Sequence, residues 1–264
     1  MKIDFHTHCF PQSIASNALN SLSAGSGNMK YFTDGTKEGI IKALDKANID
    51  KAVVLNIATN PLKQSKINDA ALKLNDERIV GFGSIHPDAP DCIEELERIS
   101  QMGIKGIKLH PEYQNFNVDE PRLFKIYEKI GSLGLITVFH AGLDNAYLPP
   151  AKCSPKALKK ILPYFGGAPV VAAHTGSYMM WEDVLNILCG ENIYFDTSFC
   201  HSRIPKPLFE AIVKKHGANK ILFGSDSPWA DMQEEEKLIS SIDISQNEFE
   251  LIMGGNAARL LERL

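Results

Sequence analysis

The sequence predicts an α/β protein with one domain over residues 1–264, folded as a (β/α)8 TIM barrel. Eight short runs rich in β-branched and aromatic residues alternate with segments whose apolar residues recur at helical spacing. Several of these runs are apolar at every position, which is typical of parallel strands covered on both faces. The length of 264 residues also lies near the usual size of a single barrel.

The expected strands are short and follow one another along the whole chain. They fall at residues 2–6, 51–57, 79–85, 104–110, 135–140, 169–174, 192–197 and 220–225. Helical spacing between them predicts helices that include Glu38–Ala47, Ile93–Met102, Leu123–Ile130, Pro155–Leu162 and Leu208–Lys214. A doubly wound open sheet competes with the barrel. It would place a Gly-rich phosphate loop after the first strand, where this chain has Thr7-His8-Cys9-Phe10-Pro11.

Two further segments need an interpretation. Residues 12–36 are rich in Ser, Gly and Asn, and we expect a lid or substrate loop there, with a disordered surface loop as the alternative. A final helix from about Gln246 to Arg263 is expected to pack across the outside of the barrel.

Composition limits the partners and the compartment. A net charge of -4 gives no basic surplus for nucleic acid, so small molecules are the expected partners. The five cysteines are scattered without a C-x-x-C pair, which indicates a reduced, intracellular chain. No apolar run reaches membrane-spanning length and the start shows no cleavage pattern, so we expect a cytoplasmic protein without a membrane partner. We expect a homodimer, which is the commonest assembly among soluble oligomeric enzymes.

Several of the apolar runs end on a histidine or an aspartate, which are residue types that bind metals. His6 and His8 are two apart, so they share one face of the first strand and can bind one ion together. His140 and Asp226 end later strands, and a closed barrel brings them to the same mouth. Three or four N/O ligands with an open position are typical of catalytic zinc, so one zinc ion is expected and a second is left open.

Other residues at the mouth receive roles around this metal. His174 is expected to polarise substrate or transfer a proton, and Asp226 to accept the proton of an attacking water as well as bind metal. Lys108 shares a face with His110; it is either carbamylated to bridge a second metal or paired with an acid or a substrate carboxylate. The candidate substrate contacts are Lys108, His110, Tyr113, Arg203 and Trp229, and the cations among them favour an anionic substrate. His86, which precedes Pro87, is either a strand-capping histidine or a ligand, whereas His201 and His216 are interpreted as structural.

Several motifs together resemble the amidohydrolase superfamily, and most closely its amidohydrolase-related branch. They are Asp4-Phe5-His6-Thr7-His8, Lys105-Gly106-Ile107-Lys108-Leu109-His110-Pro111, Phe139-His140-Ala141-Gly142, Ala173-His174-Thr175-Gly176, Phe223-Gly224-Ser225-Asp226-Ser227-Pro228-Trp229 and Gly255-Asn256-Ala257-Ala258-Arg259-Leu260-Leu261. The resemblance implies a metal-dependent TIM barrel. It matches the first-strand pair to His6 and His8, and the later ligands and proton-handling histidine to His140, His174 and Asp226.

The resemblance leaves the reaction open, because the branch contains both hydrolases and non-oxidative decarboxylases. The leading expectation is a metal-dependent hydrolase in which zinc-bound water attacks the carbonyl of an amide, ester or lactone. The alternative is a zinc-dependent decarboxylase of an aromatic or unsaturated carboxylic acid. Many decarboxylases of the branch carry a glutamate in the first-strand segment, whereas this chain has Asp4-x-His6-x-His8-Cys9-Phe10, which favours hydrolysis. A metal-containing binding barrel without catalysis is the second alternative.

Overall fold

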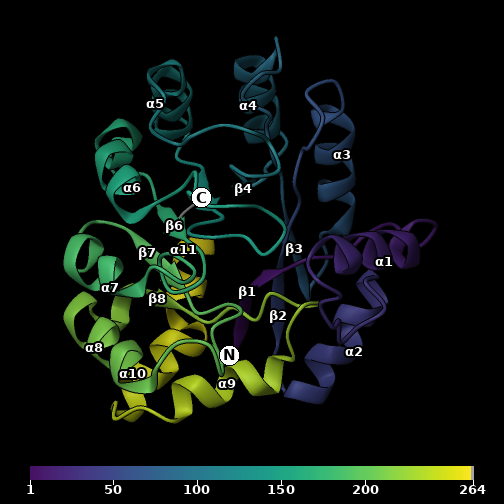
Figure 1. Cartoon of the computed structure of the whole chain (residues 1–264). Helices are drawn as coiled ribbons and strands as arrows, with labels where there is room; N and C mark the ends of the chain where they lie inside the picture. Colours follow the sequence, from purple (N-terminus) through teal and green to yellow (C-terminus); the bar gives the residue numbers. More distant parts are fainter. Residues whose placement is uncertain (263–264) are drawn as a thin grey trace.

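The eight predicted strands form a closed parallel barrel in the computed structural model, which describes residues 1–262 (Figure 1). The strands are β1 Ile3–Thr7, β2 Lys51–Leu55, β3 Ile79–Phe82, β4 Gly106–Leu109, β5 Ile136–Phe139, β6 Val170–Ala172, β7 Tyr194–Asp196 and β8 Ile221–Leu222. They pair in two continuous runs, β1 to β3 and β4 to β8. Single parallel bridges, Gly83 with Ile107 and Thr7 with Ser227, join the two runs and close the ring.

Most of the helices surround the barrel on its outside (Figure 1). The helices are α1 Ala15–Gly25, α2 Lys37–Ala47, α3 Gln64–Leu74, α4 Cys92–Gln101, α5 Phe124–Ser132, α6 Pro155–Ile161, α7 Trp181–Asp183, α8 Lys206–His216, α9 Met232–Ser240, α10 Gln246–Glu250 and α11 Asn256–Glu262. Short 3-10 or π segments are η1 Pro121–Leu123, η2 Leu162–Phe165, η3 Val184–Leu188, η4 Ala218–Lys220 and η5 Leu251–Gly255. Among the described residues, no helix has the length and apolar character needed to cross a membrane.

Two apolar clusters hold the fold. The larger one lies between the strands and the surrounding helices, where residues such as Ile107 and Leu109 of β4 are buried. The smaller one fills the barrel interior and includes Phe5, Phe82 and Val138. On β4 the alternation therefore turns Lys108 away from the helices and toward the interior, one step below His110, as the sequence predicts.

A bulge in β1 decides where the first two histidines point. Asp4 pairs with Ala52 and Thr7 with Val54, so two residues of β1 lie opposite the single Val53. The extra residue reverses the alternation of β1 partway along the strand. Phe5 consequently packs in the interior while His6 and His8 face the cavity at the mouth.

The segment after β1 is not an unstructured loop. Residues 15–25 form helix α1, which buries Ala15 and Leu19 although the Ser and Asn residues around them hide this pattern in the sequence. In Figure 1 α1 projects at the right of the barrel beside α3. Residues of this segment also line the cavity described below, in keeping with the predicted substrate loop.

The expected final helix is wrong in two respects. It is divided into α10, η5 and α11, and Gly254 has non-helical dihedral angles. A Cβ at Gly254 would lie 2.2 Å from the carbonyl oxygen of Met1, so the backbone approaches β1 too closely for a regular helix. Beyond this break, Ala257 and Leu260 of α11 join the interior cluster instead of packing across the barrel's outside. Arg263, the predicted helix end, lies outside the described residues.

Candidate metal centre and active-site cavity

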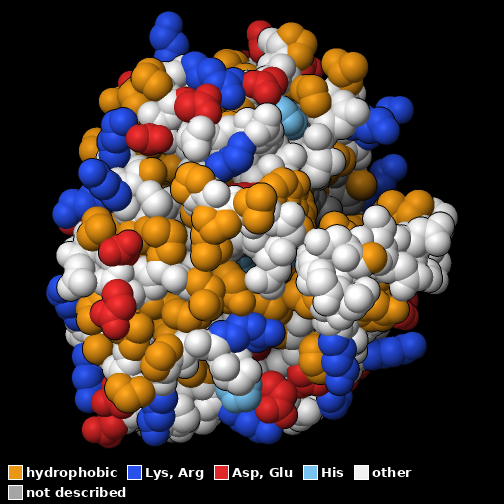
Figure 2. Space-filling view, viewed as in Figure 1, with side chains coloured by type: hydrophobic (Ala, Val, Ile, Leu, Met, Phe, Trp, Pro, Cys, Tyr) orange, Lys and Arg blue, Asp and Glu red, His pale blue; other side chains and the backbone are white. Residues whose placement is uncertain are grey.

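A cavity of about 560 Å³ opens where the strands end, on the side of the barrel where TIM-barrel enzymes bind substrates. Most predicted site residues line it: His6, His8, Lys108, His110, Tyr113, His140, His174, Asp226 and Trp229. Figure 2 shows apolar side chains gathered near the centre of this face, beside a lobe at the right, where α1 lies, that is mostly backbone and uncharged, non-hydrophobic side chains. The structure thus brings nine of the predicted residues to one place.

Arg203 is the exception among the predicted substrate contacts. Its guanidinium lies 3.5 Å from the ring centroid of Phe199 and donates a hydrogen bond to the carbonyl of His201. Phe199, and not Arg203, lines the cavity. The stacked ring of Phe199 thus forms the cavity wall beside Arg203, and a direct contact between Arg203 and the substrate stays a prediction.

His6, His8 and Asp226 converge on one point. The two Nε2 atoms lie 3.2 Å apart, and Asp226 Oδ1 lies 3.3 Å from His6 Nε2 and 3.2 Å from His8 Nε2. The backbone holds the three together, since the Asp226 amide donates to the carbonyl of His6. Asp226 also has a φ of 69°, a left-handed conformation that a non-glycine residue adopts only where its surroundings enforce it.

The protonation of this trio fits a bound cation. His8 Nδ1 lies 2.9 Å from the carbonyl oxygen of Leu55, which can only accept, so Nδ1 carries the proton and Nε2 has a lone pair. His6 Nδ1 faces the carboxylate of Asp196 at 2.8 Å with the same result, and burial followed by the charge of Lys108 lowers the pKa of His6 to about 4. Two imidazole lone pairs and a carboxylate oxygen are ligands for a divalent metal.

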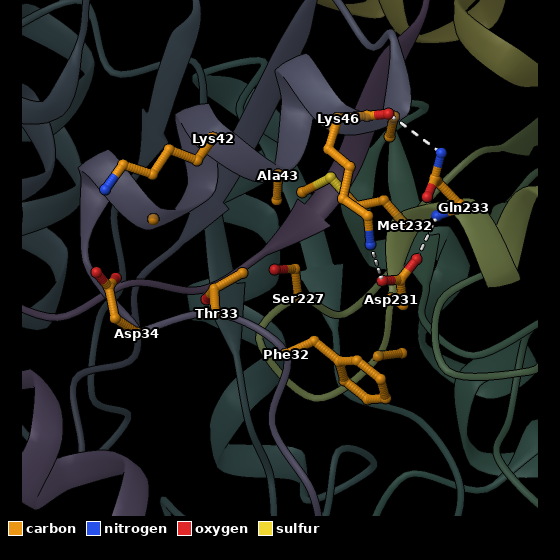
Figure 3. Close-up of a pocket in the computed structure, with 13 residues that line it drawn as sticks. Phe32, Thr33, Asp34, Lys42, Ala43, Lys46, Ser227, Asp231, Met232 and Gln233 are labelled. Carbon is orange, nitrogen blue, oxygen red and sulfur yellow. Dashed lines mark hydrogen bonds and ion pairs between the residues drawn. The ribbon is translucent and has the colours of Figure 1, made fainter.

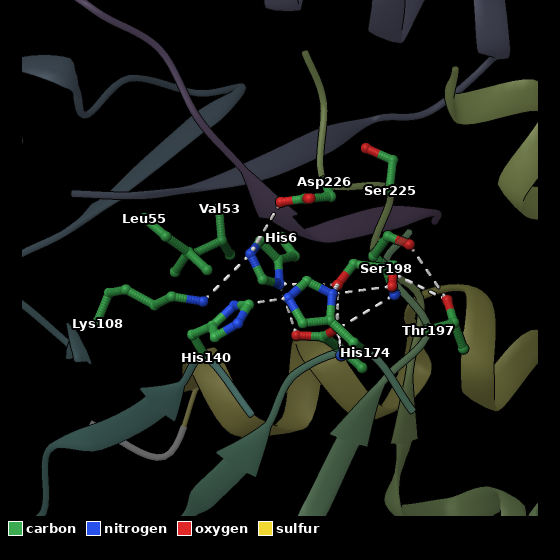
Figure 4. Close-up of polar contacts among 12 residues, drawn as sticks. His6, Val53, Leu55, Lys108, His140, His174, Thr197, Ser198, Ser225 and Asp226 are labelled. Atoms are coloured by element: carbon green, nitrogen blue, oxygen red, sulfur yellow. Dashed lines mark hydrogen bonds and ion pairs between the residues drawn. The ribbon is translucent and has the colours of Figure 1, made fainter. Parts of the chain in front are cut away.

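Asp196 connects this trio to His174, the predicted proton-transfer histidine, whose ring lies beside His6, His140 and Ser198 in Figure 4. Asp196 Oδ2 accepts from the ring of His6, while its Oδ1 accepts from the backbone amide of His174 at 3.0 Å and from the amide and hydroxyl of Ser198. Burial alone would raise the pKa of Asp196, but the charge and hydrogen bond of His6, with the charges of His174 and Lys108, hold that pKa well below its usual value. Sequence reasoning missed Asp196, although it ends the seventh strand as Asp226 follows the eighth.

His174 and His140 form a second pair beside the trio. His174 Nε2 lies 3.0 Å from His140 Nδ1, and the other nitrogen of His174 faces Ser198. His140 Nε2 faces the carbonyl of Leu143 at 3.3 Å and Asp144 at 3.8 Å, so His140 is not part of the convergent trio. Its role as fourth ligand stays a prediction. His174 has a φ of 61°, and the hydrogen bond from its backbone amide to the carboxylate of Asp196 stabilises this left-handed conformation.

A second cluster of ligand types, His110, His140 and Asp144, does not offer the same lone pairs. The amide of Tyr113 donates to His110 Nδ1 at 3.4 Å, so the neutral ring carries its proton on Nε2 and directs it toward Asp144 at 3.5 Å. His110 also stacks between Tyr113 and His140, with ring centroids 3.8 and 4.1 Å away. The chemistry of the trio therefore fits one metal better than two.

Lys108 is a buried cation at the deep end of the cavity. Its Nζ lies 3.2 Å from His6 Nε2, and among residues 1–262 no carboxylate forms an ion pair with it within 4.0 Å. Burial lowers its pKa to about 8. Pairing with an acid of the protein, one of the expectations for this lysine, is not seen. A carboxylate supplied by the substrate is the partner that this environment leaves open.

Two histidines outside the expected metal site, His86 and His216, have local partners. His86 Nδ1 accepts from the amide of Asp88 in a turn, and His216 accepts from the amide of Gly190 and contacts the carbonyl of Ile193. Neither lines the cavity.

A smaller cavity of about 220 Å³ lies beside α2 and the start of α9, and it contains none of the predicted site residues (Figure 3). An ion pair of 2.9 Å between Lys46 and Asp231 crosses its edge, and Gln233 donates to the carbonyl of Lys46. These contacts fasten α2 to α9.

A (β/α)8 barrel with imidazole and carboxylate ligands in its mouth belongs to the class of metal-dependent barrel enzymes. The family model described as Amidohydrolase matches residues 3–263, so the chain belongs to the amidohydrolase family. Membership in a family of enzymes disfavours the metal-containing barrel without catalysis.

Two curated relatives match part of the chain. One is the 2-keto-4-carboxy-3-hexenedioate hydratase of Sphingobium sp., 26% identical over 67% of this chain and 62% of that protein. The other is the 2-amino-3-carboxymuconate-6-semialdehyde decarboxylase of Dictyostelium discoideum, 26% identical over 53% of this chain and 48% of that protein. The matches thus span between about half and three fifths of these relatives.

Solved structures of similar fold cover 99% of the chain. A 2,6-dihydroxybenzoate decarboxylase bound to 2,6-dihydroxybenzoate has a TM-score of 0.72 at 16% identity and is covered over 99% of its length. A dihydroxybenzoic acid decarboxylase from Polaromonas sp., with bound manganese and 2-nitroresorcinol, has a TM-score of 0.71 at 14% identity and is covered over 96%. At these identities the likeness establishes the barrel fold.

Proposed function

We propose that this protein is a metal-dependent, non-oxidative decarboxylase of a planar aromatic or unsaturated carboxylic acid. The observation that carries the proposal is Lys108, a buried cation that has no carboxylate partner in the described chain and lies beside the metal-ligand trio. The named relatives support it, since a decarboxylase and a hydratase of an unsaturated carboxylic acid are among them. They favour decarboxylation over the hydrolysis that the first-strand sequence suggested.

The chain's own groups divide the work of the reaction. Lys108 binds the substrate carboxylate, and the stacked rings of Tyr113, His110 and His140 provide a flat wall for a planar body. Loss of carbon dioxide leaves an electron pair on carbon, which takes up one proton, so a carboxylate and a proton become a C–H bond and carbon dioxide. His174 Nε2 and Asp226 face the cavity and supply that proton site.

We propose one zinc ion per chain, held by His6, His8 and Asp226 with His140 as the fourth ligand. Imidazole and carboxylate ligands suit zinc, and the manganese of the Polaromonas structure is the natural competitor. When bound, the metal supplies Lewis acidity toward a carboxylate or a neighbouring oxygen of the substrate. Elemental analysis of the purified protein, followed by reconstitution with each metal, identifies the active ion.

A paired screen tests the proposed reaction. The metal-loaded protein is given aromatic and unsaturated carboxylic acids while released carbon dioxide is measured, and in parallel it is given amides, esters and lactones. The expected result is carbon dioxide and the decarboxylated product from at least one acid, with KM raised about tenfold or more in Lys108→Met because a charged hydrogen bond is lost. Hydrolysis of the second panel without carbon dioxide from the first would refute the proposal.

A further inference from the structure

We infer that the substrate carries a second anionic group, which Lys63 and Lys66 bind at the outer end of the same cavity. The inference rests on the proposed function only in taking this cavity as the substrate site. It narrows the substrate class to dianions whose two charges lie at opposite ends of an apolar body.

One face of α3 forms the outer wall of the cavity. Lys66, Ile67 and Ala70 line it from within α3, where their helical spacing places them on a single face, and Lys63, the residue immediately before the helix, lines it as well. Both lysines are exposed, and neither forms an ion pair within the described part of the chain. Two unpaired cations therefore share the face that borders the cavity.

The acids near α3 are engaged on its other side. Asp69, the one acid within the helix, pairs with Arg98 of α4 at 2.8 Å. Glu95 of α4 contacts the same arginine at 2.7 Å and accepts from Asn68 and Ser65 of α3. The carboxylates that could neutralise the two lysines are thus held in the contact between α3 and α4, and the cavity side of α3 keeps its positive charge.

Positively charged side chains outnumber carboxylates among the residues that line the cavity. Three lysines line it, against two carboxylates, Asp144 and Asp226. Asp226 belongs to the proposed metal site, and Asp144 faces the rings of His110 and His140 at 3.5 and 3.8 Å. A dianion would meet Lys108 at the deep end and Lys63 and Lys66 at the outer end.

Aliphatic side chains of β2, of the loop after it and of α3 line the cavity, together with the polar Asn56 and Thr59. Leu55 ends β2 inside the barrel, Ile57 follows it, and Ile67 lies on α3 beside Lys63 and Lys66. The chain thus lines the cavity from the barrel interior to α3 with aliphatic side chains near the two cationic ends. An apolar, planar spacer between two carboxylates matches this order of surfaces.

Equilibrium binding to the metal-loaded protein tests the inference with defined probes. Three dicarboxylates of increasing length are compared with their monocarboxylate counterparts: benzene-1,4-dicarboxylate, naphthalene-2,6-dicarboxylate and biphenyl-4,4′-dicarboxylate. The variants are Lys63→Gln/Lys66→Gln and, as matched control, Lys73→Gln, which removes an exposed lysine of α3 that does not line the cavity. At least one dicarboxylate is expected to lose about tenfold in affinity in the double variant, since two charge contacts are removed.

The monocarboxylates, and every probe with the Lys73 control, are expected to keep their affinity within about twofold. The inference is overturned if no probe gains affinity from its second carboxylate, or if the gain survives in the double variant. Lysine-dependent binding of a dicarboxylate without carbon dioxide release would uphold the inference and count against the proposed reaction. Decarboxylation of monocarboxylates with unchanged kinetics in the double variant would support the proposed reaction and count against the second anion site.

Discussion

Replacing Asp196 by Asn exchanges one carboxylate oxygen for an NH2 group at the centre of the site. Three donors face Oδ1 of Asp196: the amides of His174 and Ser198 and the hydroxyl of Ser198. The amide oxygen of the variant stays where these donors are, so its NH2 group is turned toward His6 Nδ1, 2.8 Å away in the wild type. Two donors then oppose each other. His6 relieves the conflict by moving its proton to Nε2, the atom that faces His8 and Asp226.

A proton on His6 Nε2 removes one of the three lone pairs that converge on the proposed metal position. Loss of a hydrogen bond that orients a metal-ligating histidine typically costs about 10 to 100-fold in metal affinity, or about 1.4 to 2.8 kcal/mol. We expect the dissociation constants of Asp196→Asn for zinc and for manganese to rise by that factor. Competition with a fluorescent chelator, starting from metal-free protein, measures both constants.

Asp4→Asn is the matched control, because Asp4 is a barrel-strand carboxylate that is as fully buried as Asp196. Its Oδ1 accepts from the backbone amides of His6 and Ser225 and does not contact the imidazole ring. Its variant should keep metal affinity within about threefold, and circular dichroism checks that both variants fold. Wild-type metal affinity in a folded Asp196→Asn protein would refute the tautomer argument.

Three further outcomes are expected. His174→Gln should lower kcat about 100-fold or more with little change in KM, because a proton-transfer group typically contributes about that factor. Steady-state kinetics on the substrate found by the screen measure both constants, and a rise in KM as large as the fall in kcat would contradict the assignment. Gly254→Ala should lower the free energy of unfolding in urea by about 1 to 3 kcal/mol, since its Cβ would lie 2.2 Å from the carbonyl oxygen of Met1. Gly255→Ala, whose Cβ has its nearest neighbour at 3.4 Å, should cost less, and equal stabilities of the two variants would contradict the packing argument. Burial raises the pKa of Glu235 to about 8, so the folded protein retains a proton that the unfolded chain loses above about pH 4.5. The free energy of unfolding should therefore fall by up to about 1.4 kcal/mol per pH unit as the pH rises toward 8. Urea unfolding at pH 5 and pH 8 should show a smaller decrease for Glu235→Gln than for the wild type.

Much of the barrel and its mouth could be predicted because strands in this fold share one direction. Apolar runs that end on His8, His110 and His140 must bring those side chains to the same end of the sheet. Asp196 could not be singled out, since its importance comes from contacts with His6 and His174, which are far from it in sequence.

In two segments the secondary structure departs from the expectation for the same physical reason. Helix α1 is stabilised by the burial of Ala15 and Leu19 against the rest of the protein, and its own Ser and Asn content gives little sign of a helix. The last helix has a continuous helical pattern, yet close contact of Gly254 with the backbone of Met1 interrupts it. In both places tertiary contacts override local preference, and a single sequence does not display such contacts.

The bulge in β1 separates two tasks that one strand performs. Up to Phe5 the strand contributes to the apolar interior, and beyond the extra residue it contributes ligands. Substitutions at His6 or His8 can therefore change the chemistry of the mouth without disturbing the packing below it. Strand β1 is in this respect modular, and an exchange of its last residues should graft a different ligand set onto the same folded barrel.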